Sequence, residues 1–183
     1  MRIIAGKYRR RVIKSPPSLR TRPTSDRLRE TLFNILAPQI TDETRFLDLC
    51  SGTGAVGIEA LSRGASFAVF VDKSRKACAL IEENLDLLEI PESETEVVHS
   101  DALEFLKKTK ESFDLIFFDP PYQTDYREVL EMVGGENEKI LADDGIFIAE
   151  HDKRNALPDA VGNLRRWRIL TQGGSSLSFY EQA

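Results

Sequence analysis

Short apolar runs alternate with helical stretches along most of this chain, and this alternation constrains the fold more than any other feature. The runs are strand-sized and rich in Val, Ile and Phe, at residues 45–50, 67–72, 96–99, 113–119 and 145–150. Most of them are too apolar to have a solvated face, so we expect parallel strands covered by helices on both sides. The pattern predicts a doubly wound α/β fold.

Two more strand-like segments, 168–171 and 176–180, have no helical stretch between them. They predict an antiparallel pair that closes one edge, which makes the sheet mostly parallel and seven-stranded. The clearest helix begins near Ser74. Another, capped by Thr24 or Ser25, ends before Pro38.

The chain has 183 residues, which fits one domain. Its longest apolar runs fall far short of the roughly 20 residues that a membrane span requires. The N-terminus lacks the pattern of a signal peptide, and two cysteines form no disulfide framework or metal-ligand spacing. We therefore expect a cytoplasmic monomer without a metal site or a membrane partner.

Positive charge is concentrated at the N-terminus. Residues 1–29 contain ten Arg or Lys and one acid, whereas the rest of the chain contains 15 bases and 29 acids. We expect two short strands within residues 2–14, and we divide the chain into a basic hairpin arm (1–23) and a main domain (24–183). The asymmetry suggests a polyanion held at one edge, and a solvated basic hairpin is the alternative.

Aspartates follow or end four of the predicted parallel strands: Asp48, Asp72, Asp101 and Asp119. Ligands of doubly wound sheets bind beyond the carboxyl ends of the strands, where the strand order reverses. We therefore expect an acidic rim around the binding site.

A G-x-G-x-x-G pattern at Gly52, Gly54 and Gly57 joins a strand to a helix, and Asp72 follows at the distance typical of a ribose-binding acid. Alone, this pattern suggests a dinucleotide enzyme, or a glycine turn without a ligand. An acidic rim disfavours a pyrophosphate at the helix N-terminus. It suits S-adenosylmethionine, which has no phosphate and a net positive charge.

In this interpretation Asp72 binds the ribose hydroxyls, and Asp101 with the Ala102 amide binds the adenine edge. Thr24 is expected near the methionine end of the cofactor. The full set of expected cofactor contacts is Asp48, Cys50, Ser51, Gly52, Thr53, Gly54, Asp72, Lys73, Asp101, Ala102 and Thr24.

The sequence Asp119-Pro120-Pro121-Tyr122 resembles the (Asn/Asp)-Pro-Pro-(Tyr/Phe) motif of methyltransferases that act on exocyclic amines of nucleobases. Together with the segments 21–36 and 173–180, it makes the chain similar to the RsmD family. Those bacterial enzymes form N2-methylguanine in 16S ribosomal RNA, at the guanine conventionally numbered 966. The resemblance implies a class I, Rossmann-like methyltransferase fold, with 16S ribosomal RNA or the small ribosomal subunit as the partner.

The motif suits the chemistry of a base amine, whose lone pair is delocalised into the ring. Asp119 and the Pro120 carbonyl can accept hydrogen bonds from its two N–H groups and so orient the nitrogen. Pro120 and Pro121 stiffen the loop. Tyr122 offers a flat face for a base taken out of its stack. The expected catalytic residues are therefore Asp119, Pro120, Pro121 and Tyr122. A rigid Pro-Pro turn is the alternative.

The expected RNA contacts are arginines of the arm and of the helix that follows it: Arg9, Arg10, Arg11, Arg20, Arg22 and Arg27. Arg29 is a further candidate for a phosphate contact. Arg22 and Arg27 have a second possible role near the cofactor, where Arg27 would pair with its carboxylate. His99 and His151 form no ligand set. Trp167 and Phe179 are expected in the core, and Cys50 is expected to be an apolar neighbour of the cofactor.

Three other functions compete with this interpretation. A nicotinamide-dependent oxidoreductase would use the same glycine loop but leaves the Asp-Pro-Pro-Tyr motif unexplained. An adenine-N6 methyltransferase acting on DNA or RNA would share the motif, although DNA enzymes of that kind usually carry a separate recognition domain. A non-catalytic RNA-binding module would not need the intact motif.

Overall fold

The computed structural model describes residues 1–16, 26–121, 125–135 and 139–183. A single eight-stranded sheet has the order β3-β2-β1-β4-β5-β8-β7-β6. Its strands are β1 (Arg45–Leu49), β2 (Phe67–Asp72), β3 (Thr95–His99), β4 (Phe113–Phe118), β5 (Leu141–Asp152), β6 (Ala160–Val161), β7 (Leu164–Gln172) and β8 (Ser175–Gln182). The first five in chain order pair in parallel, and β8 pairs antiparallel with both β5 and β7.

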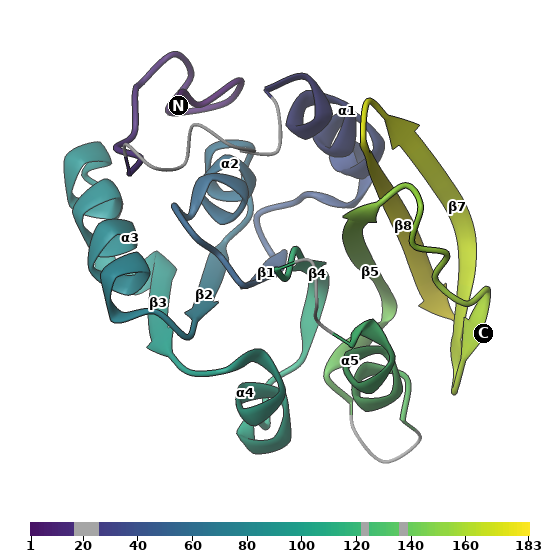
Figure 1. Ribbon diagram of the computed structural model, residues 1–183. Helices are drawn as coiled ribbons and strands as arrows, with labels where there is room; N and C mark the ends of the chain where they lie inside the picture. The colour runs from purple at the N-terminus through teal and green to yellow at the C-terminus, as the bar shows by residue number, and fades with distance from the viewer. Residues whose placement is uncertain (17–25, 122–124, 136–138) are drawn as a thin grey trace.

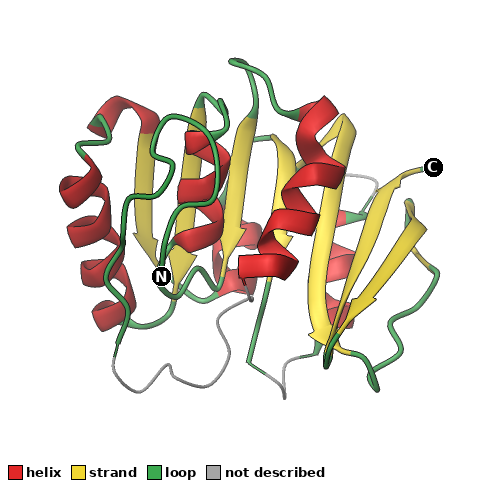
Figure 2. Cartoon of the chain, turned by 90° about the horizontal axis from the view of Figure 1, so that it is seen from above, coloured by secondary structure: helices red, strands yellow, loops and turns green. Residues whose placement is uncertain are grey.

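Helices cover both faces of the sheet (Figures 1 and 2). The helices are α1 (Asp26–Leu36), α2 (Ala55–Ser62), α3 (Arg75–Leu88), α4 (Ala102–Lys108) and α5 (Tyr126–Val133), with short 3-10 turns η2 (Ala37–Gln39) and η3 (Glu92–Glu94). One apolar core lies beneath α1, α2 and α3, and a second lies beneath α4 and α5. The doubly wound α/β fold predicted from the sequence is confirmed.

The strand order reverses between β1 and β4. In a doubly wound sheet this is the point where the connecting helices leave the sheet on opposite sides and open a crevice. The glycine loop after β1 and the Asp119-Pro120-Pro121 segment after β4 therefore both lie at the switch point.

The predicted count of seven strands was one too low, because β6 contains only Ala160 and Val161. Two residues cannot show an alternating pattern. Val161 pairs with Leu164 across a two-residue turn, in which Gly162 adopts a positive φ of 56°. A Gly-Asn pair at such a turn is a hairpin signal that the sequence did contain.

The N-terminal segment has the predicted hairpin course, but its two strands were not confirmed. Arg2 and Val12 form an isolated bridge, and the Ile3 and Ile13 amides donate to the Arg11 and Met1 carbonyls. The amides of Ile4 and Ala5 do not bond across the hairpin but donate to the carboxylate of Glu59 in α2.

This segment is packed firmly on the main domain. Ile3, Tyr8 and Ile13 are buried in the core beneath α1, α2 and α3. Gly6 has a φ of 81°, and a Cβ there would meet the Ser62 carbonyl oxygen at 1.7 Å, so only glycine fits. The boundary proposed at residues 23 and 24 lies outside the described residues.

Trp167 and Phe179 were both predicted to be core residues. Phe179 is fully buried, as predicted, but Trp167 is 42% exposed. The prediction for Trp167 was wrong because β7 has a bulge between Arg166 and Arg168, near the edge of the sheet. Its ring packs on Phe179, with centroids 5.5 Å apart.

Candidate active site

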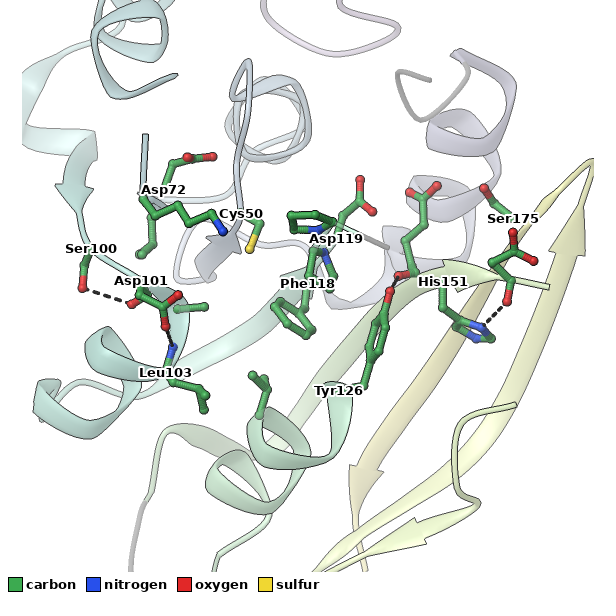
Figure 3. Close-up of a pocket in the computed structure, with 18 residues that line it drawn as sticks. Cys50, Asp72, Ser100, Asp101, Leu103, Phe118, Asp119, Tyr126, His151 and Ser175 are labelled. Atoms are coloured by element: carbon green, nitrogen blue, oxygen red, sulfur yellow. Dashed lines mark hydrogen bonds between the residues drawn. The ribbon is translucent and has the colours of Figure 1, made fainter. Parts of the chain in front are cut away.

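A cavity of about 340 Å³ opens at the carboxyl ends of the parallel strands. Figure 3 shows side chains from several separate strand ends facing it. Of the residues predicted from the sequence, the following line it: Cys50, Asp72, Lys73, Asp101, Ala102, Asp119, Pro120 and Pro121. The structure thus brings both predicted groups, for the cofactor and for the chemistry, to one cavity.

The loop after β1 turns sharply. Cys50, Gly52 and Gly54 all have positive φ, at 64°, 57° and 76°. The Asp72 carboxylate holds this turn, because Oδ2 accepts from the Gly52 amide at 2.9 Å and Oδ1 accepts from the Ser74 amide at 2.8 Å. Each oxygen keeps a second lone pair, so Asp72 can still accept hydroxyl donors from a ligand.

Asp48 was predicted as part of the acidic rim, but it lies beneath the loop. It is 2% exposed, and Oδ2 accepts from the Gly57 amide at 2.9 Å. Burial raises its pKa to about 7, against the effect of that hydrogen bond. Asp48 does not line the cavity; it fixes the end of β1 to α2.

Gly54 and Gly57 likewise face the protein interior. A Cβ at Gly54 would meet Ile81 at 3.3 Å, and one at Gly57 would meet the Phe70 ring at 2.3 Å. Their role is close packing of α2 against β2 and α3.

Gly52, Ser51 and Thr53 complete the predicted loop contacts but are absent from the cavity lining. The Ser51 hydroxyl donates to the Asp48 carbonyl at 2.6 Å, and the Thr53 carbonyl accepts from Asn84 at 3.0 Å. These contacts support the loop from within.

Asp101 lies in the loop between β3 and α4. As the N-cap of α4, its side chain accepts from the Leu103 amide at 3.0 Å. Asp101 itself is exposed, and Ala102 beside it is buried. A carboxylate and a helix-start amide thus adjoin at the cavity wall.

Asp119 and the two prolines form the wall next to the glycine loop. The Asp119 amide donates to the Leu49 carbonyl at 3.4 Å, which connects the ends of β4 and β1. Pro120 is buried and Pro121 is exposed. Tyr122, the last residue of the motif, lies outside the described residues.

The sequence interpretation missed a third group, on the β5 side of the cavity: Tyr126, Glu150, His151, Asp152 and Ser175. The Tyr126 hydroxyl donates to the Glu150 carbonyl at 2.9 Å, and His151 Nε2 lies 2.9 Å from the Ser178 hydroxyl. Glu150 ends the predicted strand 145–150, which lies beside the strand that leads to Asp119, and His151 and Asp152 follow it directly. Their position at the same rim was the signal that could have found them.

Cys50 is not activated as a nucleophile. Burial, reinforced by the negative charge of Asp72 and Asp119, raises the pKa of its thiol to about 12. The neutral thiol behaves as a small apolar group, in agreement with the sequence interpretation.

Of the predicted RNA contacts, Arg9, Arg10 and Arg11 are exposed on the N-terminal segment, and Arg27 is exposed in the first turn of α1. The Arg11 guanidinium also donates to the Leu87 carbonyl at 2.6 Å, near the end of α3. Arg20, Arg22 and Thr24 lie outside the described residues.

Arg29 has a different, internal role. It is fully buried, donates to the Arg2 carbonyl at 2.5 Å and lies 3.8 Å from Glu59. Burial lowers its pKa, and the charges of Glu59 and Asp26 oppose that shift.

Among the described residues, no group of three or more His, Cys, Asp or Glu side chains is arranged to hold a metal ion. A separate search of the same residues finds no helix with the length and apolarity to cross a membrane.

A family model described as "Conserved hypothetical protein 95" matches residues 1–181. Ribosomal RNA small subunit methyltransferase D of Escherichia coli is 35% identical over 100% of this chain and 90% of that protein. The protein of the same name from Haemophilus influenzae is 32% identical over 98% of this chain and 91% of its own length.

The fold is also similar to that of a solved structure with comparable sequence identity. The solved structure of Escherichia coli yhhF has a TM-score of 0.87 and 34% identity, and the match covers 100% of this chain and 97% of that one. The chain therefore belongs to the conserved hypothetical protein 95 family, the RsmD family of the small-subunit methyltransferase D proteins.

Proposed function

We propose that this protein transfers a methyl group from S-adenosylmethionine to the exocyclic N2 amine of a guanine in 16S ribosomal RNA, at the position conventionally numbered 966. The observation that carries the proposal is the convergence of Asp119-Pro120-Pro121 with Asp72 and Asp101 on one cavity. The names of the full-length relatives, which are small-subunit ribosomal RNA methyltransferases, support it.

The cavity fits the cofactor by the chemistry of its donor set. Acidic side chains dominate its polar lining, with Asp72, Asp101 and Asp119 facing the same space. A cationic ligand without phosphate suits such a site better than a dinucleotide does. Asp72 would bind the ribose diol, and Asp101 with the Ala102 amide would bind the adenine. When bound, S-adenosylmethionine supplies the methyl group on its sulfonium.

The protein's own task is to orient the amine. Asp119 and the Pro120 carbonyl would accept hydrogen bonds from its two N–H groups, which favours a geometry that frees the nitrogen lone pair. Pro120 is buried and fixed, so these acceptors are preorganised. Methylation makes the nitrogen acidic, and Asp119 or solvent then takes the released proton.

The exposed arginines would hold the RNA. Arg9 and Arg10 are exposed on a segment that buried Ile3, Tyr8 and Ile13 anchor to the main domain. A phosphate bound by them would therefore be held at a fixed place relative to the cavity. Arg27 retains both predicted roles, a phosphate contact or a partner for the cofactor carboxylate.

The experiment that tests this proposal offers labelled S-adenosylmethionine with unmodified small-subunit RNA, with its ribonucleoprotein particle, and with DNA. We expect transfer to the RNA or the particle and none to DNA. Transfer to DNA would favour the adenine-N6 alternative, and transfer to neither would contradict the proposed activity.

A further inference from the structure

Asp119, directly after β4, and Glu150, within β5, occupy equivalent positions on neighbouring strands. In the parallel pair β4 and β5, Phe118 lies opposite Ala149. The next residues along each strand, Asp119 and Glu150, therefore lie side by side, with the strands about 4.8 Å apart. Both residues line the cavity.

The two side chains also share a face of the sheet. Phe118 and Ala149 belong to the core beneath α4 and α5, whereas the preceding residues Phe117 and Ile148 belong to the core beneath α1, α2 and α3. Because side chains alternate along a strand, those of Asp119 and Glu150 point to the same face of the sheet as those of Phe117 and Ile148. In Figure 3 the Asp119 carboxylate accordingly extends away from the Phe118 ring.

Glu150 is held in a fixed position. It is 7% exposed, and its carbonyl accepts from the Tyr126 hydroxyl at 2.9 Å. The Tyr126 ring packs edge-on against Phe118, with centroids 5.6 Å apart. Burial raises the pKa of Tyr126, and the negative charges of Asp119 and Glu150 add to that shift.

Guanine is the base whose Watson–Crick edge matches two adjacent carboxylates, because its N1–H and its N2 amine are neighbouring donors. Adenine would instead turn the lone pair of N1 toward one of the carboxylates. We propose that Glu150 determines specificity for guanine, its carboxylate accepting from N1–H while Asp119 holds the N2 amine. This inference rests on the function proposed above.

The test replaces the target guanine of an RNA substrate with 2-aminopurine, which keeps the 2-amine but lacks N1–H. The wild type should prefer guanine by about 100-fold in kcat/KM, the scale of one lost hydrogen bond to a charged group. In Glu150→Gln, whose side chain can also donate to a bare N1, the preference should fall below about fivefold.

Glu181→Gln is the matched control, because it makes the same chemical change at an exposed position of the neighbouring strand β8. It should keep the wild-type preference. Binding of S-adenosylhomocysteine and the melting temperature report whether Glu150→Gln is folded. A purely structural role would lower transfer to both substrates equally.

The outcomes separate this inference from the proposed function. If the wild type methylates no guanine in RNA, the proposed function fails. If it methylates guanine and 2-aminopurine equally well, the role of Glu150 is refuted without any variant. An unchanged preference in folded Glu150→Gln would refute it as well.

Discussion

The buried carboxylate of Asp48 accepts a hydrogen bond from the backbone N–H of Gly57 at 2.9 Å, which joins β1 to the first turn of α2. The sequence suggested that Asp48 faces a ligand, but in the structure it is buried beneath the loop after β1 and holds that strand to α2. Its raised pKa then has a consequence for stability.

Asp48→Asn should change how stability depends on pH. The folded pKa of about 7 exceeds the ordinary 3.8, so the folded state binds more protons between these values. Stability from this group is fully present below about pH 4 and is lost as the pH rises through 7. The free energy of unfolding of the variant should therefore rise relative to that of the wild type across this pH range, by up to about 4 kcal/mol. Urea unfolding at several pH values measures this, and a constant difference would contradict it.

Asp72→Ala should weaken binding of S-adenosylhomocysteine by roughly 1.5–3 kcal/mol, the scale of a hydrogen bond to a charged group. Asp114→Ala is the control, because Asp114 also accepts a backbone N–H, that of Arg45, but at the amino ends of the strands, away from the cavity. Calorimetry should show normal affinity for the control and no binding of NAD to the wild type. Tight NAD binding would point to an oxidoreductase.

Asp119→Ala should lower kcat by about 100-fold or more, because it removes an acceptor that orients the amine. Affinity for S-adenosylhomocysteine should change far less. Asp86→Ala, an exposed acid on α3, serves as the comparison. Turnover of Asp119→Ala at the normal rate would mean that the Asp-Pro-Pro segment is only a turn.

Replacing Arg9 and Arg10 with Ala should weaken RNA binding without affecting the cofactor. The slope of log affinity against log salt should decrease by about 0.7 per lost phosphate contact with single-stranded RNA. Arg11 is left intact, because its bond to Leu87 also supports the fold. Lys107→Ala with Lys108→Ala removes equal charge from α4 and should leave the slope unchanged. If both pairs behave alike, RNA binds elsewhere.

The strands and helices were predictable because their patterns are local. Phe113–Phe118 reads as a buried strand from its own residues, and Ser74 as a helix cap that accepts from the Ala77 amide. The two-residue strand β6 and the exposure of Trp167 depend instead on a hairpin and a bulge at the sheet edge.

The site was predictable in part, for a related reason. Asp72, Asp101 and Asp119 all line the cavity, because each ends or follows a strand that ends there. The burial of Asp48 and the packing of Gly54 against Ile81 arise from contacts between distant segments. The position of Glu150 beside Asp119 likewise depends on the pairing of β5 with β4, which the sequence alone does not reveal.

The identity of the modified nucleoside decides whether the protein methylates the N2 amine of guanine. Small-subunit RNA incubated with the protein and S-adenosylmethionine would be digested to nucleosides and analysed by mass spectrometry against standards. The account predicts N2-methylguanosine, formed by the wild type and reduced about 100-fold in initial rate by Asp119→Ala. N6-methyladenosine as the product, or N2-methylguanosine formed equally fast by Asp119→Ala, would contradict it.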